Sequence, residues 1–181
     1  MEKDSMSIEK GFIQIYTGNG KGKTTAAFGQ ALRAAGSGLK TFIVQFMKSF
    51  PYGEIKSIQA LKDLVRLEQY GDDTFVLERK PPSVKDMRAA TQAMHRARET
   101  MLSGKFDIVI LDEVCVAIYF YLLKTEDVIA MLDEKPEPVE LILTGRYCPP
   151  EIIAKADLVT EMMEIKHYYQ KGVVARKGIE S

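Results

Sequence analysis

The chain has 181 residues, of which 46% are hydrophobic and 28% are charged, and its 25 basic and 25 acidic side chains cancel. This composition is typical of one globular domain, and the balanced charge excludes a basic surface that would hold a nucleic-acid backbone. The longest apolar run, 114–123, is about half the length that spans a bilayer, and residues 1–10 lack the apolar stretch of a signal peptide. We therefore expect a cytoplasmic protein that binds neither nucleic acid nor membrane.

Residues 12–25 are the most informative stretch of the chain. An apolar, strand-like segment leads into a glycine-rich turn, and small, helix-forming residues follow at 26–35. Strand, glycine-rich turn and helix in this order are typical of a phosphate-binding loop. Compared with the pattern G-x-x-x-x-G-K-[ST], one position differs, because Thr17 stands where the first glycine belongs.

Each part of this loop suits a bound phosphate chain. Glycines let backbone N–H groups converge on an anion, and the N-terminus of the following helix adds partial positive charge. The Lys23 ammonium can reach phosphate oxygens, the Thr24 hydroxyl can bind Mg²⁺, and Lys21 adds a second cation. We expect a nucleoside triphosphate to be bound by Gly18, Asn19, Gly20, Lys21, Gly22, Lys23, Thr24 and Thr25.

The next segments predict two strands separated by irregular structure. Residues 40–46 are strand-like, 48–57 contain turn formers, and 55–61 fit a short helix. Residues 65–70 alternate with a period of two, which indicates a strand. Residues 71–82 contain two prolines and predict an irregular loop.

A longer helix is predicted to begin after Ser83. Asp86 stands three residues later, as in a capping box. Apolar residues then recur at spacings of three and four, which indicates a stripe packed against the core, and His95 falls outside this stripe. The stripe consists of Met87, Ala90, Met94, Ala97 and Met101.

Two later apolar strands end in polar residues that suit a phosphate site. Residues 106–111 lead into Asp112 and Glu113, the pattern that holds Mg²⁺ opposite a phosphate loop. Adjacent side chains of a strand point to opposite sides, so we expect one carboxylate to bind the metal and the other to orient it. Residues 139–143 lead to Arg146, which pairs either with phosphate oxygens or with a carboxylate in a structural salt bridge.

The alternation of strands and helices predicts an α/β fold of the P-loop NTPase-like (RecA-like) class, with a mostly parallel sheet flanked by helices on both faces. We expect a single domain over 1–181, in which 1–10 form an N-terminal arm and 164–181 a C-terminal tail. Residues 158–163 fit a last strand. The apolar run 114–123 has no polar face at helical period, so it is either a buried helix or a subunit contact.

Several segments together resemble the ATP:corrinoid adenosyltransferases that are built on a phosphate-loop fold and act on cob(I)alamin or cob(I)yrinic acid a,c-diamide. The glycine-rich loop, with its initial threonine, is more specific than a general phosphate loop. The resemblance covers residues 11–180. It is carried by residues 17–25, 44–48, 111–113, 143–146 and 156–162 and, in the tail, by 166–167, 172–173 and 175–180.

The resemblance implies transfer of the 5′-deoxyadenosyl group of ATP to cobalt(I) of a corrinoid, with release of triphosphate. Lys23 and Glu113 would be the catalytic residues, because the leaving triphosphate accumulates negative charge that cations and Mg²⁺ stabilise. Thr24 and Glu113, with Asp112 beside them, would hold the metal. The resemblance also implies a homodimer, and a flavin or other reductase that supplies cobalt(I).

The corrinoid pocket is where the sequence departs from the family. A Phe-x-Trp segment packs beside the corrin ring in the family, and Phe75 and Leu77 stand at these positions here. The chain contains no tryptophan. Because leucine offers less flat apolar area than tryptophan, we expect base-free corrinoids such as cobinamide to be preferred over complete cobalamin.

Two other functions fit parts of the pattern. An ATPase or kinase would use Glu113 to polarise water or an acceptor hydroxyl, and a non-catalytic nucleotide- or corrinoid-binding protein would need no catalytic residue. The threonine at position 17 and the tail motif oppose the first alternative. The presence of Lys23, Thr24 and Glu113 opposes the second.

Overall fold

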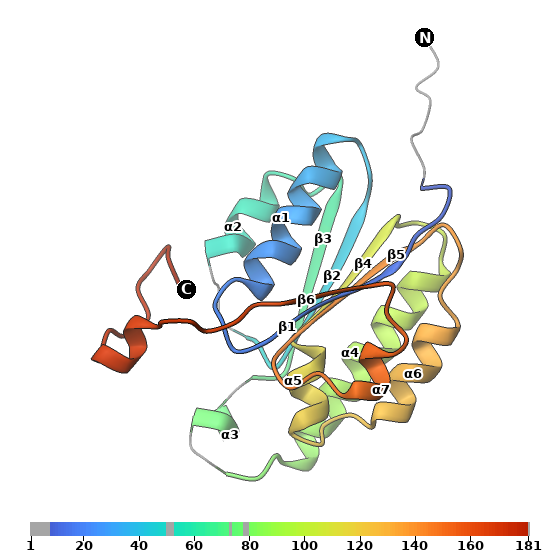
Figure 1. The fold of residues 1–181 in the computed structure, drawn as a ribbon. Helices are drawn as coiled ribbons and strands as arrows, with labels where there is room; N and C mark the ends of the chain where they lie inside the picture. Colours follow the sequence, from blue (N-terminus) through green and yellow to red (C-terminus); the bar gives the residue numbers. More distant parts are fainter. Residues whose placement is uncertain (1–7, 50–52, 73, 78–79, 181) are drawn as a thin grey trace.

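The computed structural model describes residues 8–49, 53–72, 74–77 and 80–180. Strands from these ranges form one parallel sheet in the order β3-β2-β4-β5-β1-β6 (Figure 1). This arrangement confirms the predicted α/β class with a parallel sheet. The strands are β1 (Ile13–Thr17), β2 (Thr41–Phe46), β3 (Val65–Tyr70), β4 (Ile108–Asp112), β5 (Glu140–Thr144) and β6 (Leu158–Glu161).

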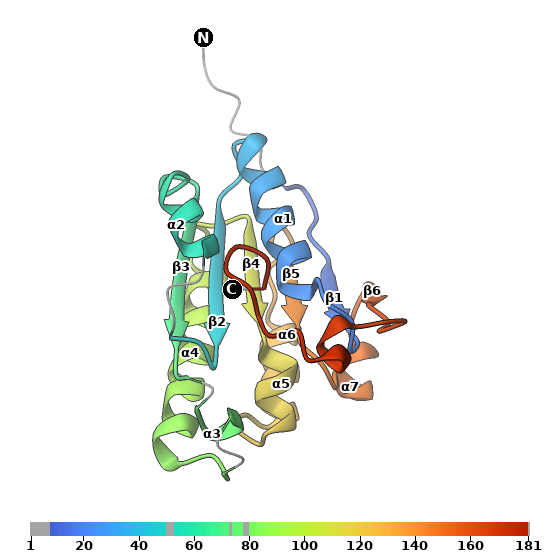
Figure 2. The same cartoon turned by 90° about the vertical axis from the view of Figure 1, so that its left-hand side faces the viewer.

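Helices cover both faces of the sheet, as parallel connections require. Helices α1 and α2 lie on one face, and α4, α5 and α6 lie on the other (Figures 1 and 2). The helices are α1 (Lys23–Gly36), α2 (Gly53–Gln59), α3 (Thr74–Leu77), α4 (Val84–Leu102), α5 (Val114–Tyr119), α6 (Thr125–Asp133), α7 (Pro150–Ile153) and a 3₁₀ turn, η1 (Tyr168–Lys171).

The two cores follow from the alternation of side chains along the strands. In β4, Ile108 and Ile110 belong to the core beneath α1, whereas Val109 and Leu111 belong to the opposite core. The buried apolar side chains of helix α1 are all small, so the helix lies close to the strands and its first turn sits at the carboxyl end of β1. These small buried side chains are Ala27, Ala31, Ala34 and Ala35.

Helix α4 begins as the sequence predicts, because Ser83 and Asp86 form both hydrogen bonds of a capping box. His95 is exposed, and the rest of the predicted stripe is buried: Ala90, Met94, Ala97 and Met101. The prediction is wrong for Met87, which is 38% exposed. Its turn of α4 extends beyond the carboxyl ends of the strands, so no sheet lies beneath it (Figure 2).

The predicted irregular loop 71–82 contains one helical turn, α3. The Asp72 carboxylate accepts a hydrogen bond from the Thr74 backbone N–H at 2.9 Å, which caps this turn. Such local capping by aspartate competes with extended structure and is not visible in the apolar pattern.

The apolar run 114–123 is not one continuous helix. Helix α5 ends at Tyr119, after which Leu122 and Leu123 turn into the core and Tyr121 is 86% exposed. The apolar side chains of the run are thus divided between core and surface. No helix in the described ranges is long and apolar enough to cross a membrane.

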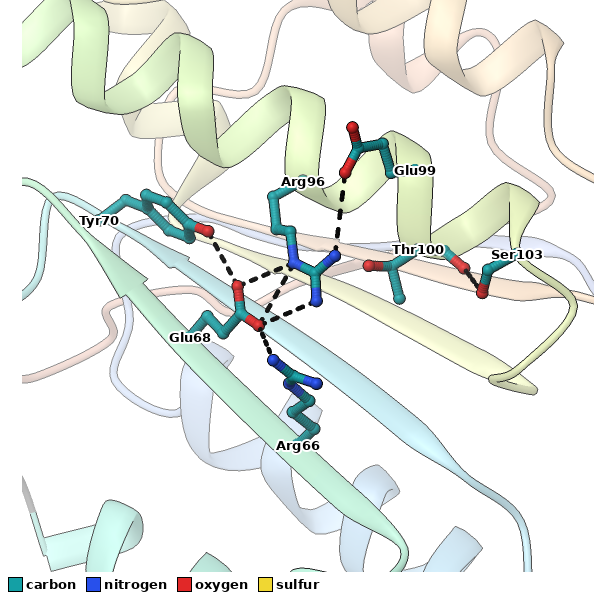
Figure 3. Close-up of polar contacts among 7 residues, drawn as sticks. All are labelled: Arg66, Glu68, Tyr70, Arg96, Glu99, Thr100 and Ser103. Atoms are coloured by element: carbon teal, nitrogen blue, oxygen red, sulfur yellow. Dashed lines mark hydrogen bonds and ion pairs between the residues drawn. The ribbon is translucent and has the colours of Figure 1, made fainter.

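A polar network fixes α4 to the edge strand β3 (Figure 3). Arg96 of α4 donates to the Glu68 carboxylate through Nε at 3.0 Å and Nη2 at 3.2 Å. The Tyr70 hydroxyl donates to Glu68 at 2.8 Å, and Arg66 Nη2 lies 2.7 Å from the same carboxylate. Arg96 also lies over the Phe42 ring, 5.3 Å from its centroid, so this one side chain connects helix, edge strand and core.

The network shifts the pKa values of its members. Burial opposes ionisation of Glu68, but hydrogen bonds from Arg96 and Tyr70 outweigh it and lower the pKa of this carboxyl. Burial, together with the hydrogen bond to Glu68, raises the pKa of Tyr70 to about 12. The network is therefore formed by charged Glu68 and neutral Tyr70 at neutral pH.

We predict that Glu68→Gln lowers the free energy of unfolding by about 1 kcal/mol at pH 7, since the lost ion pair is partly exposed. Because folding lowers the pKa of Glu68, its contribution is complete above the ordinary glutamate value of 4.5 and is lost as the pH falls through the lower folded-state value. Urea unfolding of wild type and variant from pH 7 to pH 3 measures this difference.

Glu99→Gln is the matched control. Glu99 also pairs with Arg96, but its side chain is 72% exposed and the two charged groups are 3.8 Å apart, so this i,i+3 ion pair is weak. It should change stability by no more than a few tenths of a kcal/mol. Equal effects of the two substitutions, or a Glu68→Gln deficit that does not decrease as the pH falls from 7 to 3, would contradict the assignment.

Candidate active site

The glycine-rich loop packs against the backbone that follows β6. A Cβ atom on Gly18 would lie 2.5 Å from the Met162 carbonyl oxygen, and one on Gly20 would lie 2.7 Å from it. The Gly20 N–H donates to that oxygen at 2.6 Å. Thr17 is still part of β1 and pairs with Glu161 of β6, so a strand residue stands where a turn glycine is usual. Gly18 and Gly20 are thus required by the close backbone of Met162. This requirement is separate from the role that we expect for them at a phosphate.

Lys23 begins helix α1 and is held inside the loop. Gly22 precedes it with φ of 122°, a conformation that favours glycine. The Lys23 ammonium donates to the Gly20 carbonyl at 2.7 Å. Burial and the nearby charge of Arg146 lower the pKa of Lys23, and the Glu113 carboxylate opposes this shift. The amine is therefore placed within the loop before any ligand arrives.

Asp112, at the end of β4, is fully buried and accepts four hydrogen bonds. Oδ1 accepts from the Thr24 hydroxyl at 2.9 Å and the Thr144 hydroxyl at 2.7 Å. Oδ2 accepts from Gln45 Nε2 at 2.9 Å and Lys48 Nζ at 2.8 Å. Burial would raise the pKa of Asp112, but the Lys48 charge and these hydrogen bonds lower it. Asp112 thus joins α1 to the ends of β2, β4 and β5.

Glu113 is the carboxylate that faces the cavity. No hydrogen bond or ion pair joins its side chain to another residue of the described ranges. Its backbone has φ of 68°, and its N–H donates to the Thr144 hydroxyl at 2.9 Å. Burial, followed by the charge of Asp112, raises the pKa of Glu113. A nearby cation would reverse this shift and stabilise the charged form.

Strained backbone is concentrated at this edge of the sheet. Met47, Glu113 and Tyr147 are non-glycine residues with φ between 57° and 68°, and all three line the cavity. Gly145 has φ of 139°, and a Cβ there would lie 2.8 Å from the Cys115 Cβ. Such conformations cost about 1–3 kcal/mol each and persist where the fold imposes them, most often at functional sites.

One cavity of about 1110 Å³ lies at the carboxyl ends of the strands. Its polar wall comes from the loop and strand ends, and its apolar wall from α3, α5 and the segment after β5. Ligands of open parallel sheets bind at this edge. The polar wall includes Lys21, Lys23, Thr24, Glu113 and Arg146, and the apolar wall Val76, Val116, Tyr119, Phe120 and Tyr147.

The C-terminal tail also reaches the cavity, through His167 and residues 178–180. Lys21 Nζ donates to the Ile179 carbonyl at 2.8 Å. The Glu180 carboxylate closes the tail on itself, accepting from the Tyr168 hydroxyl and from Arg176 Nη2 at 3.1 Å. Hydrogen bonds from Arg176 and Tyr168 lower the pKa of Glu180 to about 2, so the closure holds across the physiological range.

The structure brings together most, but not all, of the predicted site residues. Residues 20–25, Glu113 and Arg146 line the cavity, whereas Gly18 and Asn19 lie outside its lining. Phe75 is only 6% exposed and packs edge-on against Phe120, with ring centroids 5.5 Å apart. The side chain of Leu77 lies outside the described residues.

Several residues of the site were not predicted from the sequence. Gln45 and Lys48 hold Asp112 together with Thr144, and their segment, 44–48, was conspicuous only as part of the family resemblance. Tyr119 and Tyr147 line the cavity. For Tyr119 the apolar run 114–123 had instead predicted a place in a buried helix or in a subunit contact. No periodicity distinguishes an aromatic side chain at a cavity from one in the core.

Known proteins match the chain over nearly its whole length. The family model described as ATP:corrinoid adenosyltransferase BtuR/CobO/CobP matches residues 9–181. The corrinoid adenosyltransferase of Escherichia coli K12 is 37% identical over 175 residues, which is 95% of this chain and 86% of that protein. Corrinoid adenosyltransferase CobA of Salmonella typhimurium is 35% identical over 173 residues, with the same coverage. The corrinoid adenosyltransferase of Pseudomonas aeruginosa is 33% identical over 173 residues, 95% of this chain and 84% of that protein.

The structure is consistent with these matches, because it has a parallel sheet, a phosphate loop and polar residues gathered at the carboxyl ends of the strands. The chain therefore belongs to the ATP:corrinoid adenosyltransferase family.

Proposed function

We propose that this chain transfers the 5′-deoxyadenosyl group of ATP to cobalt(I) of a corrinoid, using the cavity at the carboxyl ends of the strands. The observation that carries the proposal is the division of this single cavity into a phosphate-loop wall and an apolar, aromatic wall. In the reaction the cobalt electron pair forms the bond to C5′, the C5′–oxygen bond breaks, and the triphosphate leaves with its electron pair. Such a reaction needs an anion site and a site for a large flat ring side by side.

The phosphate-loop wall suits the leaving triphosphate. Lys23 and Arg146 bring positive charge to it, and backbone N–H groups at the start of α1 add theirs. Lys21 is bonded to the Ile179 carbonyl, and a phosphate oxygen is a stronger acceptor for its ammonium because the bond is charge-assisted. We propose that Lys21 exchanges the tail for the phosphate chain when ATP binds.

The residues beside the loop fit Mg²⁺. Glu113 has an unengaged carboxylate at the cavity, and Thr24 gives its proton to Asp112 and so keeps its oxygen lone pairs available. No group of three or more His, Cys, Asp or Glu side chains within the described ranges forms a protein-only metal site, which agrees with an ion held by few protein ligands and by phosphate oxygens. Bound there, Mg²⁺ would neutralise charge on the departing triphosphate.

We propose different roles for the two adjacent acids. Glu113 and Thr24 hold the metal, whereas Asp112 orients Thr24, because all its lone pairs are directed at the four donors described above. An ATPase would need an acid placed to activate water. Transfer to cobalt requires none, since the nucleophile is already an electron pair on the metal.

Two residues, Phe75 and Leu77, were predicted to contact the corrinoid. Phe75 supports Phe120 from the core, so we propose that it shapes the apolar wall without touching the ring. The preference for base-free corrinoids expected from Leu77 remains a prediction.

We further propose a cytoplasmic homodimer that receives cobalt(I) from a flavin or other reductase. The edge strand β6 supports the dimer, because its residues are exposed along its length and include the apolar Leu158 and Val159. The free edge of a strand is a template for pairing with another chain.

Lys23→Ala and Glu113→Gln are each expected to lower the rate of adenosylcorrinoid formation about a hundredfold or more, since each removes a preorganised charge at the leaving group. The assay is anaerobic, with chemically reduced corrinoid, saturating ATP and Mg²⁺. Lys124→Ala and Glu126→Gln, at the start of α6 and outside the cavity, are the matched controls. Activity of Lys23→Ala or Glu113→Gln within a few-fold of the controls would refute the site.

Lys48→Met is predicted to destabilise the fold by about 3 kcal/mol or more, because it leaves the fully buried Asp112 carboxylate without the cation 2.8 Å away, and Asp112→Asn should also destabilise it, because it breaks the same ion pair. The double variant removes both charges and should lose clearly less than the sum of the single losses. Urea unfolding of the four proteins gives the coupling energy. Simple additivity would show that the ion pair does not organise this edge of the sheet.

Sedimentation equilibrium at micromolar concentration is expected to give a dimer for the wild type. Val159→Lys should shift the equilibrium toward monomer, because it places a charge on the exposed edge of β6. A monomeric wild type would contradict the homodimer, and an unaffected dimer would move the interface elsewhere.

A further inference from the structure

Tyr119 and Tyr147 form a stacked pair on the apolar wall of the cavity. Their ring centroids are 4.2 Å apart with planes inclined by 29°, and the two residues are 50% and 51% exposed. Tyr119 ends helix α5, whereas Tyr147 lies just beyond β5. The pair therefore presents aromatic area to the cavity instead of burying it.

The backbone is built to bring these rings together. Gly145 packs so closely on α5 that a Cβ there would lie 2.8 Å from the Cys115 Cβ and 2.9 Å from the Val116 nitrogen. This approach carries the segment after β5 alongside α5. Tyr147 then has φ of 59°, which is strained for an aromatic residue. The fold thus maintains strain to hold a half-exposed ring, as is typical of functional positions.

The stacked pair is supported from the core. Phe120 packs edge-on against Tyr119, with centroids 5.2 Å apart and planes inclined by 79°. Phe75 packs edge-on against Phe120 in turn, at 5.5 Å and 89°. Edge-to-face contacts at these distances are favourable, so a row of four rings runs from the core to the cavity. The support restricts movement of Tyr119, and through it of Tyr147.

The position of the pair relative to the phosphate loop indicates its ligand. The C5′–oxygen bond of ATP breaks in line, so the cobalt must lie on the side of C5′ opposite to the triphosphate. With the triphosphate on Lys23, we assign that side to the apolar wall, because the phosphate loop does not line it. The adenine has another apolar surface available, because Phe28 of α1 lines the cavity beside Thr24 and Thr25.

We propose that Tyr119 and Tyr147 form the surface on which the corrin ring lies, so that they determine affinity for the corrinoid. This inference rests on the proposed function of the cavity. The stacked pair leaves about half of each tyrosine exposed at the cavity, which provides aromatic contact area in a chain without tryptophan. No hydrogen bond joins either tyrosine hydroxyl to another residue of the described ranges, so both can bind the amide groups at the corrin periphery.

Tyr119→Ala and Tyr147→Gly are the direct tests, and glycine suits the positive φ at position 147. Each should weaken binding of cob(II)inamide and cob(II)alamin about tenfold, as for other ligands stacked on aromatic side chains. Binding is measured by the absorbance change of the corrinoid at saturating Mg-ATP. The KM for corrinoid should rise by the same factor, while the KM for ATP stays within about twofold.

Two further sets of variants separate stacking from other effects. Tyr119→Phe and Tyr147→Phe keep the ring and should retain affinity within about threefold, which measures the share of the hydroxyls. Tyr121→Ala is the matched control, because Tyr121 is 86% exposed in the same segment, also has positive φ, and does not line the cavity. It should bind corrinoid as the wild type does.

Equal corrinoid affinity of the wild type, Tyr119→Ala and Tyr147→Gly would overturn the inference. A rise in the KM for ATP with unchanged corrinoid affinity would also overturn it, because the rings would then hold adenine. Failure of the wild type to form any adenosylcorrinoid contradicts the proposed function itself. Since corrinoid binding is measured by absorbance, apart from turnover, the two failures are distinguishable.

Discussion

The arrangement of the site depends on one buried carboxylate. Asp112 ends a central strand, and its four hydrogen bonds reach the first turn of α1, the end of β2, the segment after β2, and β5. A buried charge is stable only when it is paired and fully hydrogen-bonded, so these donors must converge on it for the protein to fold. The convergence fixes Thr24 beside Glu113 and closes the carboxyl edge of the sheet around the phosphate loop. The same requirement thus supports both stability and chemistry.

Two close backbone approaches complete the cavity. Met162 packs on the loop glycines, which attaches the C-terminal segment to the phosphate site, and Gly145 packs on α5, which brings Tyr147 to Tyr119. Neither approach leaves room for a side chain at the glycine. The first approach shapes the polar wall and the second the apolar wall. Their combination in one cavity matches a reaction that joins a nucleotide to a large flat ring.

The sequence predicted the features that depend on local pattern. The strands, the capping box at Ser83 and the position of Glu113 and Arg146 at one edge follow from periodicity and from the rules of parallel sheets. It missed Lys48 and the tyrosine pair, because their roles arise from contacts between distant segments. Met87 was misassigned for a related reason, since the spacing within a helix does not show where the sheet beneath it ends.

The most direct test of the proposed reaction is the fate of the triphosphate. In an anaerobic reaction with ATP, Mg²⁺ and chemically reduced cobalamin or cobinamide, phosphorus NMR follows the products while absorbance follows the corrinoid. The proposed reaction predicts one intact triphosphate for each adenosylcorrinoid formed, and almost no loss of ATP without corrinoid, because the metal-binding role proposed for Glu113 includes no activation of water. Release of ADP and phosphate at the same rate with and without corrinoid would contradict it.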